Sequence, residues 1–502
     1  MRWKSGFVFA LMLGGADPAV AQESAPQTLE QLAPEIDALF ATYQADAHIP
    51  GMVYGVVKDG KLAHVKGVGV QNLDDKSAIT ADSRFRIASM TKAFTALAIL
   101  KLRDDGKLRL DDLAEDHIPE MKGWVYPTKD SPRIRVRDLL HHVGGLVTDD
   151  PWGDRQQVLP QADFTKMIAA GVPFSRAPQT AHEYSNYGYA LLGRIIANAS
   201  GMAYADYIRQ AILTPLGMTS SGFDVTKTPK ALYARGYRWE NERWSPEPEM
   251  IDGAFNAMGG LQVSANDYAK WVAFLLSAWP ARNDADTGPV KRATVREMAQ
   301  GLNFVTVANR IGASGATACK QAAAYAMGWR VAQDCDLGLT LAHGGGYPGY
   351  GSHVMLMPDH GVGIFALSNR TYAGPSAPAW DSAVAMDKAG LLPERRITTS
   401  PAVWEMFNRV RAAYAEGNLN RFQGGLAMNF LLDRSAENWA AEFARLKAAV
   451  GGCYEHEKLT PTGALSANFR LICERGQLDG QLLLAPTEPI TLQALRFRVV
   501  AP

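Results

Sequence analysis

The sequence predicts an α+β fold in which helices separate two groups of strands. Residues 51–70 indicate two strands around Asp59-Gly60, a two-residue signal that is typical of a hairpin. Apolar helical segments follow, and strand-like segments return after residue 327. A chain with this order of elements forms an antiparallel sheet that joins both ends of the domain, with helices flanking the sheet.

The individual elements follow from apolar periodicity and from end signals. The segment that starts at Ser89 is apolar nearly all round, as in a buried helix, and Asp105-Gly106 is a typical C-terminal signal. Further helices are predicted over residues 136–140, 189–199 and 268–278. Strands are predicted over residues 327–333, 339–342, 354–358 and 362–368.

Two domains are expected because 502 residues exceed what one hydrophobic core usually fills. Prolines interrupt the pattern between residues 391 and 402. We therefore expect a first domain over residues 28–390 and a small accessory domain over residues 400–502. The second domain contains helical patterns at 403–415 and 436–450, followed by alternation typical of short antiparallel strands.

The composition gives no sign of a strongly charged partner. The apolar fraction is 47% and the charged fraction 20%, as in an ordinary globular protein, and 51 basic side chains balance 51 acidic ones. This balance gives no reason to expect a nucleic acid or an anionic membrane surface as partner. The oligomeric state does not follow from the composition.

The N-terminus predicts export. Arg2 and Lys4 precede a short apolar run over residues 6–13, and Ala19-Val20-Ala21 provides small residues for cleavage. We therefore predict a signal peptide over residues 1–21 and a periplasmic or secreted protein without a membrane anchor. The alternative is a buried first helix.

Four cysteines fit an oxidising compartment. Four cysteines allow three connectivities, and pairing of sequence neighbours joins Cys319 to Cys335 and Cys453 to Cys473, each pair bracketing a predicted hairpin. The sequence has no C-x-x-C motif, which makes a redox site or a zinc ribbon unexpected.

Ser89-Met90-Thr91-Lys92 places a hydroxyl and an amine one helical turn apart. A lysine within an apolar helix costs free energy unless it has a partner or a chemical task. Because a serine hydroxyl needs a base to become a nucleophile, activation of Ser89 is the task that we infer for Lys92. The alternative is an N-cap serine beside a lysine that extends to solvent.

Tyr184-Ser185-Asn186 supplies a phenol and an amide to the same chemistry. An ammonium nearby favours a phenolate, so a Ser-Lys-Tyr cluster can take the proton from the serine and return it to the leaving group. Asn186 can hold the lysine and bind a substrate carbonyl. Alternatively, the segment caps the following helix. His141-His142 has no neighbouring ligand at metal spacing, so no metal site is predicted there.

A predicted strand runs into a histidine followed by three glycines, His343, Gly344, Gly345 and Gly346. Glycines let a backbone approach a ligand closely. An N–H group of this strand and that of Ser89 together make a candidate oxyanion hole. For His343 itself, an ordinary histidine at the end of a strand is the alternative.

These motifs, in this order, resemble the serine hydrolases of the penicillin-binding protein and class C β-lactamase family, whose members include D-peptidases, D-aminopeptidases and esterases. The resemblance extends from Ile49 to Asn369. The matching segments are Phe85-Arg86-Ile87-Ala88-Ser89-Met90-Thr91-Lys92, Val136-Arg137-Asp138-Leu139-Leu140-His141-His142, Tyr184-Ser185-Asn186-Tyr187-Gly188-Tyr189, Met258-Gly259-Gly260-Leu261 and His343-Gly344-Gly345-Gly346-Tyr347-Pro348-Gly349.

The resemblance implies that the first domain is β-lactamase/transpeptidase-like, and the small helix-plus-β domain that follows it is predicted from the sequence pattern alone. It also implies roles for individual residues. Ser89 would be acylated, Lys92 and Tyr184 would transfer protons, Asn186 would hold the lysine, and the N–H groups of Ser89 and Gly346 would bind the oxyanion. It implies no metal and no organic cofactor.

The third motif departs from the β-lactamase version, Lys-Thr-Gly, because His343-Gly344-Gly345 stands in its place. The missing threonine hydroxyl lowers the expectation of β-lactam turnover and of strict carboxylate recognition. We therefore expect an exported serine hydrolase that cleaves an amide bond in peptides with D- or unusual residues. The alternatives are a carboxylesterase or weak β-lactamase that uses the same site, and a β-lactam or peptide sensor that does not hydrolyse its ligand.

Overall fold

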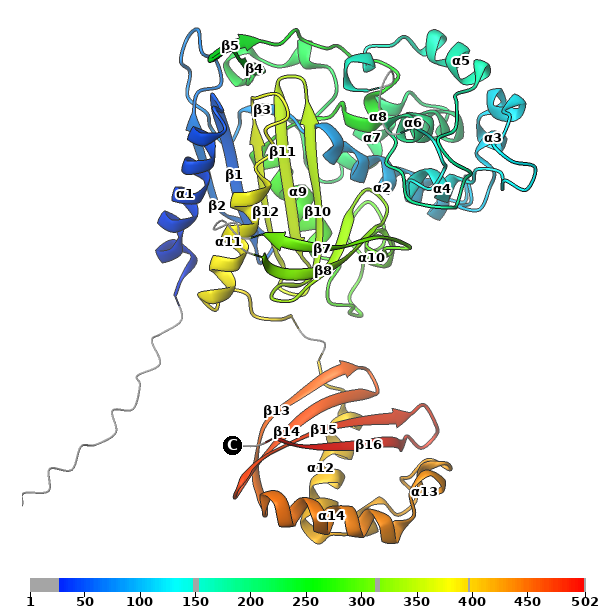
Figure 1. The fold of residues 1–502 in the computed structure, drawn as a ribbon, viewed down its shortest axis with the longest axis vertical. Coiled ribbons are helices and arrows are strands. Elements are labelled where there is room, and N and C mark those ends of the chain that lie inside the picture. Colours follow the sequence, from blue (N-terminus) through cyan, green and yellow to red (C-terminus); the bar gives the residue numbers. More distant parts are fainter. Residues whose placement is uncertain (1–26, 148–152, 312–316, 396–397, 501–502) are drawn as a thin grey trace, which may run out of the picture.

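The computed structural model describes residues 27–147, 153–311, 317–395 and 398–500 (Figure 1). The signal peptide predicted for residues 1–21 lies outside the described residues. None of the described helices combines the length and the hydrophobicity that crossing a bilayer requires.

An eight-stranded antiparallel sheet organises the first unit, in the order β2-β1-β12-β11-β10-β9-β8-β7. Its strands are β1 (Gly51–Lys58), β2 (Lys61–Gly69), β7 (Asn303–Ile311), β8 (Thr317–Tyr325), β9 (Arg330–Asp334), β10 (Gly338–Tyr347), β11 (Tyr350–Met357) and β12 (Val362–Ser368). The N-terminal hairpin pairs with the last strand, so the sheet joins both ends of the unit, as the order of elements predicted.

Helices cover both faces of this sheet (Figure 1), which confirms the predicted fold class. On one face, Met52 and Tyr54 of β1 belong to a core shared with α1 (Leu29–Asp46) and α11 (Ser376–Lys388). On the other face, Val53 and Val57 belong to the largest core, with α2 (Thr91–Asp104) and α9 (Ala265–Leu276). This alternation follows from the two-residue period of a strand.

A helical region surrounds α2, whose residues from Thr91 to Leu100 are all buried, as the apolar sequence predicted. Its helices are α3 (Ala114–His117), α4 (Val136–Leu140), α5 (Gln161–Ala170), α6 (Asn186–Ser200), α7 (Tyr204–Ile208), α8 (Asn256–Gly259) and α10 (Arg292–Met298). Two small antiparallel strand pairs complete the unit, β3 (Arg84–Arg86) with β6 (Gln262–Ser264) and β4 (Tyr237–Glu240) with β5 (Arg243–Pro246).

The sequence analysis missed the two outer strands, β7 and β8. It placed the first returning strand at residues 327–333, whereas β9 begins at Arg330. Strand β8 contains Ala322, Ala323 and Ala324, and alanine has low strand propensity. The strand therefore depends on its antiparallel pairing with β7 and β9, which a local pattern does not reveal.

The C-terminal unit has a hydrophobic core of its own, which includes Phe407, Phe443 and Leu478. Its elements are α12 (Pro401–Glu416), α13 (Phe430–Asp433), α14 (Ala436–Val450) and the antiparallel strands β13 (Cys453–Gly463), β14 (Ser466–Cys473), β15 (Gly476–Ala485) and β16 (Thr491–Val500). The division into domains at residues 28–390 and 400–502 remains our proposal, and the separate core supports it.

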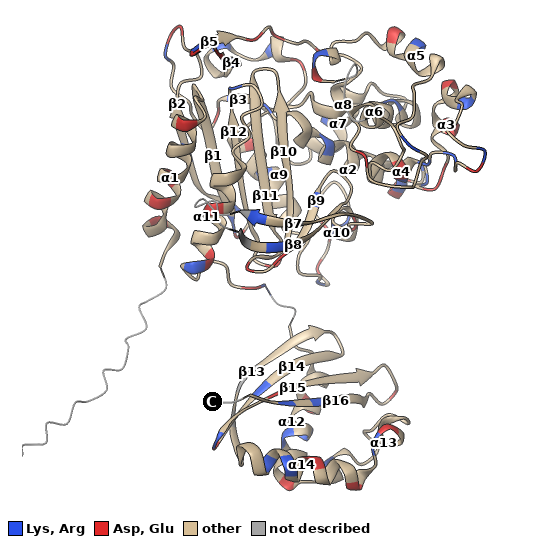
Figure 2. Cartoon of the chain, in the orientation of Figure 1, with Lys and Arg blue, Asp and Glu red and all other residues tan. Residues whose placement is uncertain are grey.

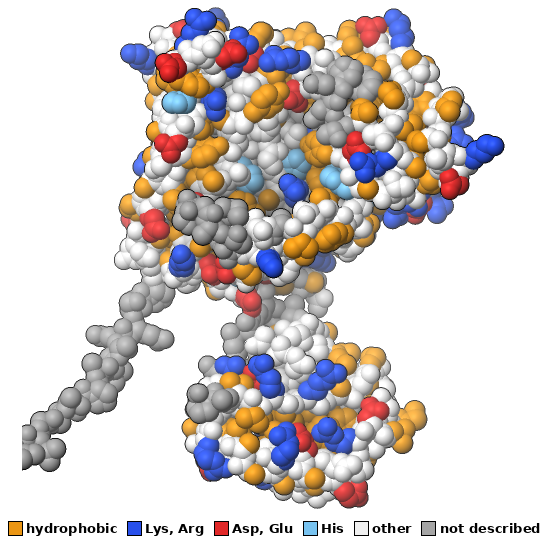
Figure 3. Space-filling model, in the orientation of Figure 1, with side chains coloured by type: hydrophobic (Ala, Val, Ile, Leu, Met, Phe, Trp, Pro, Cys, Tyr) orange, Lys and Arg blue, Asp and Glu red, His pale blue; other side chains and the backbone are white. Residues whose placement is uncertain are grey.

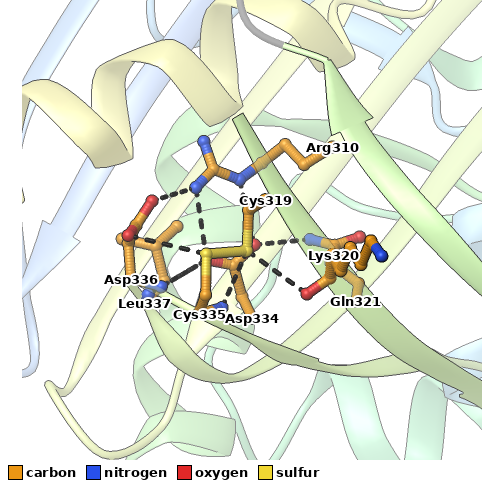
Figure 4. The surroundings of a disulfide bond; sticks show 8 residues. All are labelled: Arg310, Cys319, Lys320, Gln321, Asp334, Cys335, Asp336 and Leu337. Atoms are coloured by element: carbon orange, nitrogen blue, oxygen red, sulfur yellow. Dashed lines mark hydrogen bonds and ion pairs between the residues drawn. A yellow bond between two sulfur atoms is a disulfide. The ribbon is translucent and has the colours of Figure 1, made fainter. Parts of the chain in front are cut away.

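Both predicted disulfides are present, Cys319–Cys335 and Cys453–Cys473. The first lies beside a buried ion pair in which Arg310 donates to Asp334 (Figure 4). Burial alone would raise the pKa of Asp334, but hydrogen bonds from Arg310 and Gln321 hold the pKa below its usual range. The bridge therefore joins β8 to the end of β9 at a site that is also tied by charge.

Candidate active site

Ser89 lies in a turn of 3-10 helix, η1 (Ala88–Met90), between β3 and α2. The sequence placed it in the first turn of the α-helix, whereas α2 begins only at Thr91. Ser89 is half-buried, so its hydroxyl has access to the outside. The preceding Ala88 is buried with a φ of 48°, a left-handed conformation that costs a residue with a Cβ about 1 kcal/mol or more.

Lys92 is 0% exposed, and its amine is surrounded by oxygen atoms from three separate segments. Nζ lies 3.0 Å from Ser89 Oγ, 2.8 Å from Asn186 Oδ1 and 2.7 Å from the carbonyl oxygen of Met258. The structure thus brings together the serine, the lysine and the asparagine that the sequence singled out. The Met258 carbonyl is a partner that the sequence analysis did not identify.

This geometry accommodates both protonation states of the amine. An ammonium donates to all three oxygens. A neutral amine donates to the Asn186 and Met258 carbonyls, which only accept, and keeps its lone pair for the Ser89 hydroxyl hydrogen. The lysine can therefore take the serine proton and hold it without moving.

Tyr184 lies directly before α6, and Lys92 Nζ is 4.8 Å from the centre of its ring. Ser185 caps the helix by accepting the N–H of Gly188 at 3.1 Å. The ring of Tyr184 and the amide oxygen of Asn186 therefore both lie against the Lys92 amine, with Asn186 in the first turn of the helix and Tyr184 just outside it.

His142 fixes this segment. Its Nδ1 accepts the N–H of Ser185 at 3.0 Å, and its carbonyl oxygen accepts the N–H of Glu183 at 2.8 Å. Burial, and then the charge of Lys92, lowers the pKa of His142 well below its ordinary value, so the ring is neutral near pH 7. The sequence analysis considered this histidine only as a metal ligand, and its contacts instead show a residue that positions Tyr184.

The glycine segment of β10 lies against η1. A Cβ on Gly345 would stand 2.3 Å from the Ile87 carbonyl oxygen and 2.2 Å from Ser352 Oγ, which itself donates to that carbonyl. Gly346 faces the ring of Tyr372, whose Cδ1 would be 2.7 Å from an added Cβ. A Cβ on Gly344 would instead meet only ordinary contacts, the nearest at 3.8 Å. Close backbone approach therefore requires glycine at position 345, whereas a Cβ at position 346 would meet the Tyr372 side chain and position 344 has room for one.

Strand β10 has an open edge beside Ser89. Its pairing with β11 continues to Tyr347, but its pairing with β9 ends where Ala342 faces Arg330. Within the described residues, no strand covers the second edge of β10 from His343 onward. Backbone groups on such an edge can pair with an extended ligand.

His343 is buried, and both of its ring nitrogens are engaged. Nδ1 lies 2.6 Å from the Gly344 carbonyl oxygen and must donate to it, while Nε2 lies 3.0 Å from the Tyr325 hydroxyl. Burial, and then the charge of Lys92, lowers the pKa of His343 to about 3. A neutral ring held in this way orients β10. This role is close to the alternative given in the sequence analysis, an ordinary histidine at the end of a strand.

Arg330 is an exposed cation at the site that the sequence analysis missed. Burial is the main cause of the lowered pKa of His182, and the charge of Arg330 lowers that pKa further. The same charge contributes to the lowered pKa of His343. No carboxylate partner for Arg330 occurs in the described part of the chain. Figure 3 shows histidine side chains and a Lys or Arg side chain in the hollowed part of this face. A charged residue in an apolar strand was the only signal in the sequence.

Comparisons with known proteins agree with the fold. Residues 36–386 match the family model described as "Beta-lactamase". The chain is 30% identical over 344 residues to "Protein flp" of Staphylococcus aureus (strain COL), and the alignment covers 67% of this chain and 62% of that protein. It is 32% identical over 272 residues to "Beta-lactamase-like protein 2" of Dictyostelium discoideum, covering 52% of this chain and 48% of that protein. The chain thus spans less than two thirds of the length of these relatives.

Solved structures show the same fold at low sequence identity. The structure titled "Structure of the octameric penicillin-binding protein homologue from Pyrococcus abyssi" aligns with a TM-score of 0.59 at 21% identity, over 93% of this chain and 99% of that one. A class C β-lactamase aligns with a TM-score of 0.56 at 20% identity, over 73% of this chain and 98% of its own.

The two neighbouring glycines of β10 provide a matched test of the site. Gly345→Ala must push β10 away from η1, so we expect a loss of about 1–3 kcal/mol in the free energy of unfolding. We also expect a fall in kcat of at least about tenfold. Gly344→Ala meets no obstacle, so we expect kcat to change by less than about twofold and the free energy of unfolding by less than about 0.5 kcal/mol. Urea unfolding and steady-state kinetics measure these effects, and equal behaviour of the two variants would refute the close approach.

Proposed function

The chain belongs to the β-lactamase family of serine hydrolases, and from this premise we propose that it cleaves an amide bond through an acyl-enzyme on Ser89. One observation carries the proposal: the buried amine of Lys92 joins Ser89 Oγ to Asn186, beside the ring of Tyr184. Such an arrangement provides a nucleophile and a base within hydrogen-bond reach of each other.

In the proposed acylation step, Ser89 Oγ attacks the substrate carbonyl carbon while its proton passes to the Lys92–Tyr184 pair. The N–H groups of Ser89 and Gly346 hold the resulting oxyanion, and each such donor is worth about 3 kcal/mol where one has been removed. The carbon–nitrogen bond then breaks, and the leaving amine takes the proton through Tyr184. An ester joins Ser89 to the acyl half of the substrate.

Deacylation uses the same groups in reverse. A water molecule attacks the ester carbonyl and gives a proton to the Tyr184–Lys92 pair, and the proton returns to Ser89 Oγ as the ester bond breaks. The acid product then leaves. His142 and His343 are neutral near pH 7, since burial lowers their pKa, and so they position Tyr184 and β10 without carrying charge.

The proposed substrate is a peptide held in an extended conformation. The open edge of β10 supports this assignment, because it offers backbone groups next to Ser89. Arg330 lies on the neighbouring strand, β9, where the pairing with β10 ends, and its guanidinium group is suited to bind a carboxylate of the substrate. The guanidinium of Arg330 thus offers the carboxylate a partner in place of the threonine hydroxyl of the β-lactamase motif, which Gly344 lacks. The preference for D- or unusual residues rests on the resemblance to D-peptidases alone.

A carboxylesterase or weak β-lactamase is the second candidate. The carboxylesterase in particular is favoured by Gly344, which is exposed and offers no side chain to bind a substrate carboxylate. A panel of p-nitrophenyl esters, nitrocefin and D-amino-acid p-nitroanilides distinguishes the candidates. Fast ester turnover without amide turnover would reverse our ranking, and a stable penicilloyl adduct without any turnover would identify a sensor.

We also propose that the chain works outside the cytoplasm. The two disulfides support this location, because such bonds persist in oxidising compartments. Mass determination of the protein recovered from the periplasm or the medium tests the proposed cleavage after residue 21.

Substitution of the nucleophile and of the phenol tests the chemistry directly. Ser89→Ala should abolish turnover of the best panel substrate while the unfolding midpoint stays close to that of the wild type. Tyr184→Phe should lower kcat by at least about 100-fold, the usual scale of general acid–base catalysis. Retained activity in Ser89→Ala would exclude the scheme, and a loss within twofold in Tyr184→Phe would move the base role to Lys92.

Arg330→Gln tests the proposed carboxylate contact. For a D-alanyl peptide with a free C-terminal carboxylate, we expect KM to rise about tenfold, the equivalent of one charge-assisted hydrogen bond, with little change in kcat. The amidated peptide should be unaffected. Arg238→Gln, which removes an exposed arginine of β4, is the control. An equal effect of Arg330→Gln on both peptides would contradict the assignment.

A further inference from the structure

The outer face of the C-terminal sheet carries a groove of about 710 Å³. Six of the polar residues that line the groove can contact a ligand through charged or amide groups: Asn468, Arg470, Asp479, Gln481, Arg496 and Arg498. A second hollow of about 360 Å³ shares Asn468, Gln481 and Arg496 with the first, so the two form one continuous surface. Lys and Arg positions are marked on the strands of this sheet in Figure 2.

Strand register places these side chains on one face. Arg470 pairs with Asp479, which pairs with Arg498. In the adjacent row, Asn468 pairs with Gln481, which pairs with Arg496. Residues directly opposite each other point to the same side of a sheet, and residues two apart on a strand do so too. The residues between them, such as Leu471, Leu478 and Leu495, face the core on the opposite side.

Positive charges outnumber negative ones among the described residues that line the groove. Asp479 accepts from Arg470 at 2.6 Å and from Arg498 at 2.8 Å, and the hydrogen bond from Arg470 holds the pKa of that carboxyl below its ordinary value. Arg496 is exposed, and no carboxylate partner for it occurs among the described residues. Among the described side chains that line the groove, three guanidinium groups stand against one carboxylate.

The chemistry of the groove favours carboxylates on an extended peptide. A guanidinium group matches a carboxylate through paired N–H donors, and the amides of Asn468 and Gln481 can donate to and accept from a peptide backbone. Arg496 and Arg498 are two residues apart on one strand, so their Cα atoms lie about 7 Å apart. Acidic side chains at alternate positions of an extended peptide repeat at the same spacing of about 7 Å.

A nucleic acid fits this groove poorly. The two aromatic residues of the lining, Phe469 and Phe497, pack against each other and against Phe407 and Phe443 of the core. Neither ring faces outward to stack on a base, which single-stranded nucleic acids require for tight binding.

We propose that the groove on β14, β15 and β16 is a binding site for an acidic peptide segment with carboxylates at alternate positions. The site lies in the unit without the Ser89 cluster, so it requires none of the chemistry proposed for that cluster. It gives the C-terminal unit a role in capturing anionic peptide chains.

Fluorescence anisotropy with the full-length chain tests the site. The probe is a labelled peptide of sequence Glu-Ala-Glu-Ala-Glu, and the same peptide with Gln in place of Glu is the neutral probe. Arg496→Gln removes the cation that has no carboxylate partner among the described residues, and Arg445→Gln, on α14 and paired with Glu442, removes another exposed charge in the same unit. Thermal unfolding of each variant, followed by circular dichroism, verifies that the C-terminal unit is folded.

We expect saturable binding of the acidic probe, with the neutral probe at least about tenfold weaker. Arg496→Gln should weaken binding of the acidic probe about fivefold or more, the usual weight of one charge-assisted contact, while Arg445→Gln stays within twofold. Absence of binding by the wild type, or equal effects of the two substitutions, would overturn the proposal. So would stronger competition by tripolyphosphate than by the acidic peptide, or a solution mass that falls in Arg496→Gln, which would indicate an interface between copies.

Discussion

The structure of the site depends on one constraint, the burial of the Lys92 amine. A buried amine costs several kcal/mol unless its hydrogen-bonding capacity is satisfied. Here the oxygens come from Ser89, Asn186 and Met258, which lie on three separate segments of the chain. Folding of α2 therefore brings the start of α6 and the segment before β6 to the same point. The groups that satisfy the lysine in the folded state are also those that the proposed reaction uses.

A second contact keeps the nucleophile turn next to β10. Ser352 donates to the Ile87 carbonyl, and Gly345 leaves room for that carbonyl at the strand. Ala88, with its left-handed backbone, is fixed between them. A strained residue next to a nucleophile is a common device for holding a reactive side chain in one orientation. The open edge of β10 then places backbone groups within reach of an extended substrate.

Much of this arrangement was predictable from sequence because its signals are local. The 51–70 hairpin, the buried helix after Ser89 and the helix over 136–140 follow from periodicity, and the two disulfides join sequence neighbours. The Ser-Lys pair is a local spacing as well. The contact of this pair with Tyr184 and Asn186 joins distant parts of the sequence. That contact was predicted because the motifs resemble those of a family in which they form one active site.

What the sequence did not reveal depends on long-range contacts. Strands β7 and β8 exist through their mutual pairing, and Arg330 reaches the site only because β9 pairs with β10 at Ala342. The positioning role of His142 was not evident, because its partner Ser185 is more than forty residues away. The charged rows of the C-terminal sheet similarly appear only after three strands are set in register.

The most direct test of the account is the rate at which a fluorophosphonate reacts with the chain, followed by intact mass and peptide mapping. The wild type should acquire one phosphonyl group, on the peptide that contains Ser89. Lys92→Met, which keeps the length of the side chain but removes its nitrogen, should react at least about 100-fold more slowly at that residue. Modification at another residue, or an unchanged rate in Lys92→Met, would contradict the claim that the buried amine activates Ser89.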